Sequence, residues 1–182
     1  MTPARALKTI FFAILLPAIV STLLFSSGLL RQDLGGFTLR IAHFNDSHAS
    51  IEETELPLRI NGRDVTVGAG GYARLAAKAL EMRRDSGNFL LLCAGDVFQG
   101  SPYFTKYLGQ ADLELLNIAR LDAMVPGNHE FDRGSPALAG FISGASFPVI
   151  SSNIDYSRDP LLRGKTRQYK IFSFHGVKVG LL

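Results

Sequence analysis

Four side chains at three places in the sequence have the chemistry of metal ligands. Asp46 and His48 stand two residues apart, so on an extended segment both would point to the same side and could bind one divalent ion. Asp96 follows the apolar stretch "NFLLLCAG", and its two carboxylate oxygens could bridge two ions. Asn128, in "VPGNHEFD", offers a neutral amide oxygen that zinc, manganese and similar ions accept. Together these residues predict a metal site.

Each of these motifs comes directly after an apolar segment that reads as a β-strand. Strands are expected over residues 37–44, 88–96 and 147–153, with a short strand that runs into a loop over 122–128 and two more strands in 167–182 joined at His175-Gly176. Helices are expected over residues 70–87, 111–121 and 135–145, and a loop or small hairpin with a turn at Asn61-Gly62 over 52–68. The alternation indicates parallel βαβ units and an α/β layered sheet. Because loops at the carboxyl ends of such strands lie together, the candidate ligands are expected to converge.

Three motifs, "HFNDSHASIE", "GDVFQGSP" and "VPGNHEFDRG", follow one another in this order. Together they resemble the calcineurin-like metallophosphoesterases, and the "FD" after "GNHE" favours their 5'-nucleotidase branch. That branch includes periplasmic nucleotidases, UDP-sugar hydrolases and cyclic-nucleotide phosphodiesterases. The similarity runs from about Leu39 to Leu182. The resemblance implies an α/β fold in the form of a layered βαβ metallophosphoesterase-type sheet sandwich, incomplete in this chain.

The resemblance also implies how the candidate ligands would be used. Asp46 and His48 would hold one ion, Asp96 would bridge both ions, and Asn128 would hold the second. The cofactors would then be two divalent metal ions, zinc, manganese or similar. Such a pair, about 3.5–4 Å apart, clamps a phosphate and activates water for in-line attack.

His129 and Asp132 are identified by the same resemblance as a catalytic pair. His129 would stabilise charge on the phosphoryl group or the leaving oxygen, and Asp132 would orient its ring. The implied function is that of an exported metal-dependent hydrolase of phosphate esters, first of all a 5'-nucleotidase that converts a nucleoside monophosphate to nucleoside and phosphate. The alternatives are a UDP-sugar or 2',3'-cyclic-nucleotide hydrolase of the same family, or an inactive truncated or anchored remnant without turnover.

Other residues near these motifs are expected to have supporting roles. Glu130 is expected to have a structural or capping role, and Gln99 to belong to a tight loop beside the site. Cys93, the only cysteine, lies inside an apolar stretch and is expected to be a buried, inert thiol.

The N-terminal segment predicts export. Arg5 and Lys8 precede an apolar run with small residues at Ser26, Ser27 and Gly28, which is typical of a secretory signal over residues 1–28 that is cleaved near Gly28. The run from Ile10 to Leu30 is also long enough for an uncleaved membrane anchor. We therefore expect a periplasmic, cell-surface or extracellular protein that meets the membrane only through such an anchor.

The charge pattern limits the possible partners, and the histidine count limits how much of a catalytic domain is present. With 19 basic and 16 acidic residues and no basic cluster, the chain has no footprint for nucleic acid. The partner that the resemblance implies is a small nucleotide or nucleotide-like substrate. The resembled family carries further histidines on later strands and a separate C-terminal domain, whereas His175 is the only histidine after His129. Residues 39–182 are therefore expected to be the N-terminal portion of a truncated catalytic domain.

Overall fold

The computed structural model describes residues 36–182, and Leu39–Leu182 form one compact unit. The predicted signal peptide or anchor over residues 1–28 lies outside the described residues. Within the described part of the chain, no helix has both the length and the apolar character needed to cross a membrane.

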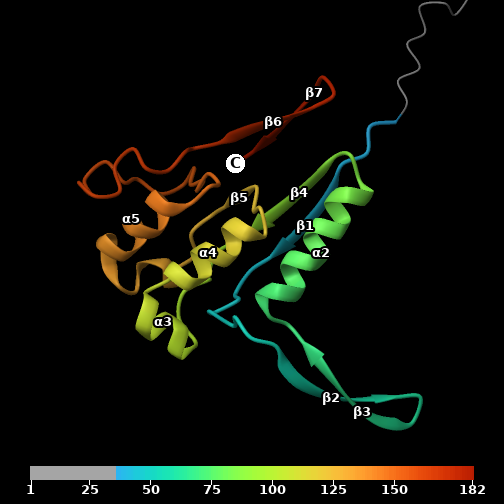
Figure 1. Ribbon diagram of the computed structural model, residues 1–182. Helices are drawn as coiled ribbons and strands as arrows, with labels where there is room; N and C mark the ends of the chain where they lie inside the picture. Colours follow the sequence, from blue (N-terminus) through green and yellow to red (C-terminus); the bar gives the residue numbers. More distant parts are fainter. Residues whose placement is uncertain (1–35) are drawn as a thin grey trace, which may run out of the picture. The chain divides into compact units, whose positions relative to one another are not determined.

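A parallel β-sheet lies at the centre of the unit (Figure 1). Its strands are β1 (Arg40–Phe44), β4 (Phe89–Cys93) and β5 (Ala123–Met124), in the order β1-β4-β5. Both pairings are parallel, and a further parallel bridge joins Met124 to Val149. The carboxyl ends of the strands therefore meet at one edge, as the sequence predicts.

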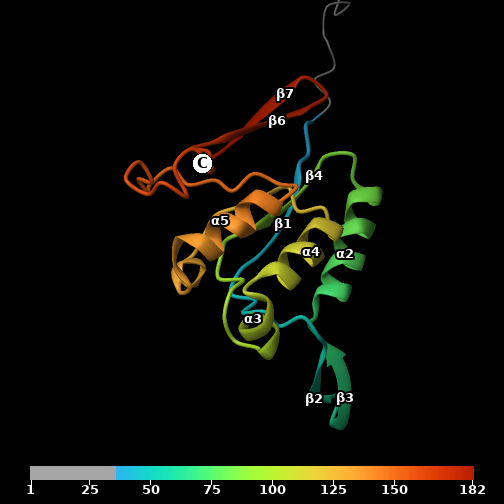
Figure 2. The ribbon, with the colours of Figure 1, turned by 60° about the vertical axis from the view of Figure 1, so that its left-hand side comes forward.

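Helices connect these strands. Helix α2 (Tyr72–Asp85) lies between β1 and β4, and α3 (Pro102–Tyr107) and α4 (Gln110–Ile118) lie between β4 and β5. After β5 come the 3-10 helix η1 (His129–Phe131) and helix α5 (Gly134–Gly144). Figures 1 and 2 show α2 and α4 side by side on one side of the sheet. The predicted α/β class with βαβ units is confirmed.

The core lies between the sheet and these helices. Phe89, Leu91 and Cys93 alternate along β4 and belong to one apolar cluster with residues of α2 and α4. Leu90 points to the other side and is also buried. Burial on both faces explains why β4 is a continuous apolar run without polar alternation.

Two antiparallel hairpins flank the sheet. Strands β2 (Thr54–Ile60) and β3 (Arg63–Ala69) meet at Asn61-Gly62, as predicted, with φ of 50° and 78°. Strands β6 (Lys170–Phe174) and β7 (Val177–Leu181) meet at the predicted His175-Gly176 turn, with φ of 47° and 90°. Two consecutive residues with positive φ make the two-residue turn that suits the twist of a hairpin.

Two details differ from the sequence prediction. The strand expected over residues 147–153 was wrong in extent, because only isolated bridges form at Val149 and Ile150. Pro148, inside this segment, has no amide proton to donate to a ladder. Helix α3 was not predicted; it begins at Pro102, whose fixed φ suits the first turn of a helix.

Candidate metal centre

The loops after β1 and β4 continue the pairing of the two strands. The Asp46 amide donates to the Gly95 carbonyl at 3.0 Å, and the His48 amide donates to the Asp96 carbonyl at 3.1 Å. These bonds extend the parallel ladder past the ends of the strands. The first motif is therefore held directly beside Asp96.

Several residues of these loops have left-handed backbone conformations. The φ angles of Asp46, His48, Asp96 and Gln99 are 52°, 46°, 55° and 76°. Non-glycine residues adopt this region at a cost in free energy, and such residues persist where the surrounding contacts hold them. The direction of these side chains is therefore set by a bent backbone, and not by the extended segment expected for Asp46 and His48.

Two glycines allow the loop after β5 to approach Asp96. A Cβ atom on Gly95 would lie 2.4 Å from the Gly127 nitrogen, and Gly95 has a φ of 94°. A Cβ atom on Gly127 would lie 2.2 Å from Oδ1 of Asp96. No other residue type fits these two positions without displacing backbone or the Asp96 carboxylate.

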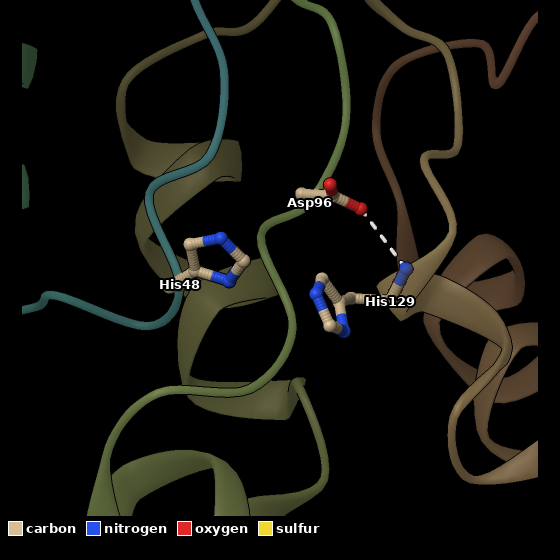
Figure 3. A group of neighbouring side chains, drawn as sticks. All are labelled: His48, Asp96 and His129. Atoms are coloured by element: carbon tan, nitrogen blue, oxygen red, sulfur yellow. Dashed lines mark hydrogen bonds between the residues drawn. The ribbon is translucent and has the colours of Figure 1, made fainter.

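His48, Asp96 and His129 form the centre of the site. Each offers one potential ligand atom, and the three atoms lie within 4.8 Å of one another. The two imidazoles lie edge to face with ring centroids 5.0 Å apart, and the His129 amide donates to Oδ1 of Asp96 at 2.9 Å. Figure 3 shows the three residues and this bond. The residues come from the loops after β1, β4 and β5, so the predicted convergence of these three loops is confirmed.

The donor set fits a divalent metal ion. Nδ1 of His48 lies 3.1 Å from the Phe98 carbonyl, which fixes that nitrogen as the donor and leaves Nε2 as the available ligand atom. Nε2 lies 3.7 Å from Oδ1 of Asp46, so Asp46 and His48 face a common point. Imidazole and carboxylate together suit zinc, manganese and similar ions.

Asn128 begins the turn that carries His129. Its side chain is exposed and makes no capping hydrogen bond to η1, while its carbonyl accepts from the Phe131 amide at 3.2 Å. Asn128 as a ligand of a second ion stays a prediction.

His129 and Asp132 form a hydrogen-bonded pair. Nδ1 of His129 lies 2.6 Å from Oδ2 of Asp132, and the Gln99 side chain also donates to that oxygen. The hydrogen bond that His129 donates to Asp132 raises the pKa of His129 above its ordinary value, and the charge of Asp96 acts in the same direction. The bonds from His129 and Gln99 lower the pKa of Asp132. The pair therefore favours a carboxylate that orients an imidazolium.

Glu130 holds the backbone of the site through buried hydrogen bonds. Its side chain is fully buried, and its two oxygens accept from the backbone amides of Asp96, Val97, Phe98 and Gly127 at 2.5–3.2 Å. One carboxylate thus joins the loop after β4 to the loop after β5. The predicted structural role of Glu130 is confirmed.

Cys93 is buried at the end of β4, and burial raises the pKa of its thiol to about 12. The predicted burial of Cys93 is confirmed, and a thiol with so high a pKa is a poor nucleophile.

Three residues in or beside the first motif were not predicted from the sequence. The Ser47 hydroxyl lies 2.9 Å from that of Tyr72, and Asp112 is fully buried close to Tyr72. In the sequence, Tyr72 reads as a helix-start residue and Asp112 as an acid in the first turn of a helix. Neither pattern signals a contact with a loop far away in the chain.

Comparison with known proteins places this arrangement among phosphoesterases. The family model described as calcineurin-like phosphoesterase matches residues 39–180. A NAD 5'-nucleotidase of Haemophilus influenzae is 34% identical over 144 residues, which is 79% of this chain and 24% of the relative. A probable 5'-nucleotidase of Treponema pallidum is 36% identical over 148 residues, 81% of this chain and 25% of the relative.

Solved structures agree with these matches. A 5'-nucleotidase precursor from Thermus thermophilus has a TM-score of 0.72 and 44% identity, and the match covers 79% of this chain and 28% of that one. The Haemophilus influenzae NAD nucleotidase has a TM-score of 0.74 and 34% identity, and the match covers 78% of this chain and 28% of that one. The chain thus spans about a quarter of the length of the curated relatives it matches.

Proposed function

The chain belongs to the calcineurin-like phosphoesterase family, and on that premise we propose that it acts in the metal-dependent hydrolysis of phosphate esters, with a nucleoside 5'-monophosphate as the substrate. One observation carries this proposal: His48, Asp96 and His129 converge within 4.8 Å at the ends of parallel strands. The substrate class is supported by the relatives that are described as 5'-nucleotidases.

Asp46, His48, Asp96 and Asn128 would hold two divalent ions. When bound, these ions supply the Lewis acid that neutralises phosphate oxygens and activates a water molecule. Asp46, Asp96 and the nearby Glu130 concentrate negative charge there, and that charge also contributes to the raised pKa of Cys93. Such a field favours a cation over a neutral occupant.

His129 would be the general acid that protonates the leaving oxygen. Its Nδ1 is held by Asp132, so Nε2 is the atom left to face the substrate. In the reaction a water oxygen forms a bond to phosphorus and the ester P–O bond breaks. Nε2 of a protonated His129 would give its proton to the leaving ribose oxygen, and Asp132 would stabilise the imidazolium until that transfer.

The test is hydrolysis by the protein that carries these residues, supplied with Mn²⁺ or Zn²⁺ and followed by chromatography of the nucleoside and nucleotide products. AMP, UDP-glucose and 2',3'-cyclic AMP are compared at equal concentration. AMP is expected to give the highest kcat/KM, and a preference for either other substrate would reassign the substrate class. No hydrolysis of any of the three with either metal would reject the proposal.

A pair of histidine variants tests the role of His129. His129→Asn is expected to lower kcat about 10²–10⁴-fold, as loss of a general acid does. His175→Asn is the matched control, because His175 lies in the β6–β7 turn at a φ of 47° that asparagine tolerates. Normal turnover in His129→Asn would refute the assignment.

We also propose that the protein is exported through residues 1–28. The charged start and apolar run support this, as does the description of a solved relative as a precursor. Fusion of residues 1–35 to a reporter that is active only after export would test it, and a reporter retained inside the cell would contradict it.

A further inference from the structure

A buried carboxylate lies beneath the first motif without a direct role in the site described above. Asp112, in the first turn of α4, is 0% exposed, and neither of its oxygens has a partner at hydrogen-bonding distance among the described residues. Its interaction with the Tyr72 hydroxyl is therefore a longer, electrostatic one. Burial of an acid without close partners costs stability, so its presence calls for a function.

Tyr72 connects this carboxylate to the first motif. Its side chain is 3% exposed, and its ring packs edge to face on Phe44 with centroids 6.5 Å apart. Its hydroxyl lies 2.9 Å from that of Ser47. Burial, followed by the charge of Asp112, holds the pKa of Tyr72 well above its ordinary value, so the hydroxyl stays protonated.

Ser47 stands between two of the candidate ligands. Its neighbours Asp46 and His48 both have left-handed backbones, so this loop depends on outside contacts for its shape. One support is the backbone pairing with the loop after β4. The contact between the Ser47 and Tyr72 side chains is another, and it joins the loop to the start of α2.

We propose that Tyr72, backed by Asp112, is a positioning residue that fixes the Asp46-Ser47-His48 loop through the Ser47 hydroxyl, so that Asp46 and His48 are set to receive a metal ion. The carboxylate of Asp112 attracts the hydroxyl proton of Tyr72. The phenolic oxygen is then free to accept from Ser47. This inference rests on the proposed metal-dependent function of the same site.

The test uses Tyr72→Phe, which removes one hydroxyl and keeps the ring on Phe44. Tyr156→Phe is the matched control, because Tyr156 is also buried and lies in a separate apolar cluster. Co²⁺ is titrated into each protein, and its visible absorption spectrum reports the ligand geometry. Tyr72→Phe is expected to weaken Co²⁺ binding about tenfold and to shift the spectrum, as loss of an outer partner of a ligand does. Tyr156→Phe is expected to match the unaltered protein.

Hydrogen exchange of the metal-free protein provides a measurement that needs no metal. In Tyr72→Phe the His48 and Ala49 amides, which donate to the Asp96 and Val97 carbonyls, are expected to exchange faster than in the control. Unchanged exchange at both amides together with unchanged Co²⁺ affinity would overturn the inference. If the unaltered protein binds no Co²⁺, the proposed metal site fails, while the exchange rates still decide whether Tyr72 positions the loop.

Variants at the two ends of the contact separate positioning from folding. Ser47→Ala should reproduce Tyr72→Phe, Ser47→Thr should retain Co²⁺ binding because it keeps the hydroxyl, and the double variant should lose no more than either single one. Asp112→Asn should weaken Co²⁺ binding less than Tyr72→Phe does. Full additivity of Ser47→Ala and Tyr72→Phe would show that the two hydroxyls act independently, which contradicts the inference.

Discussion

The backbone amide of His129 lies 2.9 Å from Oδ1 of Asp96, and this bond joins the loop after β5 to the loop after β4. One carboxylate oxygen of Asp96 thus serves the fold, which leaves Oδ2 for a metal ion. The two roles can be separated by substitution, because asparagine keeps an acceptor for the His129 amide and loses the negative charge.

Asp96→Asn is expected to fold normally and to weaken Mn²⁺ binding at least tenfold, because the central ligand loses its charge. Isothermal titration with Mn²⁺ measures the affinity, and circular dichroism checks the fold. Asp64→Asn, on the exposed β2–β3 hairpin, is the control and should bind Mn²⁺ like the unaltered protein. Unchanged affinity in a folded Asp96→Asn would remove Asp96 from the ligand set.

Gly127→Ala is expected to displace the Asp96 carboxylate, because the new Cβ atom would lie 2.2 Å from its Oδ1. The cost of such crowding is about 2 kcal/mol in the free energy of unfolding, with loss of Mn²⁺ affinity. Gly180→Ala is the matched control, since nothing lies within 4 Å of its added Cβ. Urea unfolding measures the stability of the two variants. Equal midpoints for Gly127→Ala and Gly180→Ala would show that the loops relax without strain.

Glu130→Gln is expected to destabilise the fold by about 2–3 kcal/mol. The carboxylate accepts from four backbone amides, and the glutamine NH₂ group would turn one acceptor into a donor that faces other donors. Urea unfolding provides the measurement, and Glu114→Gln on the exposed side of α4 should change stability by less than about 0.5 kcal/mol. A stable Glu130→Gln protein would mean that water or a rotated side chain satisfies these amides.

Asp112 gives the protein a pH dependence of known sign. Burial raises its pKa from 3.8 to about 6, with Tyr72 and Glu130 as the titratable groups that act on it. Between about pH 4 and pH 6 the folded state therefore binds more protons at this site than the unfolded state. Ionisation of Asp112 therefore lowers the free energy of unfolding as pH rises through that window, and this loss of stability persists above about pH 6.

Asp112→Asn removes this titration. At pH 7.5 the variant is expected to be more stable than the unaltered protein by about 2–3 kcal/mol, and the difference should shrink towards pH 4. Thermal unfolding from pH 4 to 8 measures the difference, with the exposed Asp85→Asn as control. A constant difference across this range would show that the carboxyl group does not titrate with a raised pKa. Gained stability together with weakened Co²⁺ binding would mark Asp112 as retained for the site rather than for the fold.

Local chemistry made much of the fold predictable. The alternation of apolar runs with helical patterns correctly indicated parallel βαβ units, and the Asn61-Gly62 and His175-Gly176 pairs correctly placed two hairpin turns. These features depend on neighbours within a few residues. The segment 147–153 was wrong in extent, because only Val149 and Ile150 form bridges and their partners, Met124 and Arg167, are set by packing that no local pattern reveals.

The sequence by itself determined which residue types stand at the ends of the strands, and so which loops could carry a metal site. Only the tertiary structure decided how they meet. It brought His48, Asp96 and His129 within 4.8 Å, assigned Glu130 to four backbone amides, and placed Tyr72 against Ser47 across 25 positions of chain. The reason is that periodicity fixes the direction of a side chain relative to its own element. The register and packing of whole elements fix which side chains face each other.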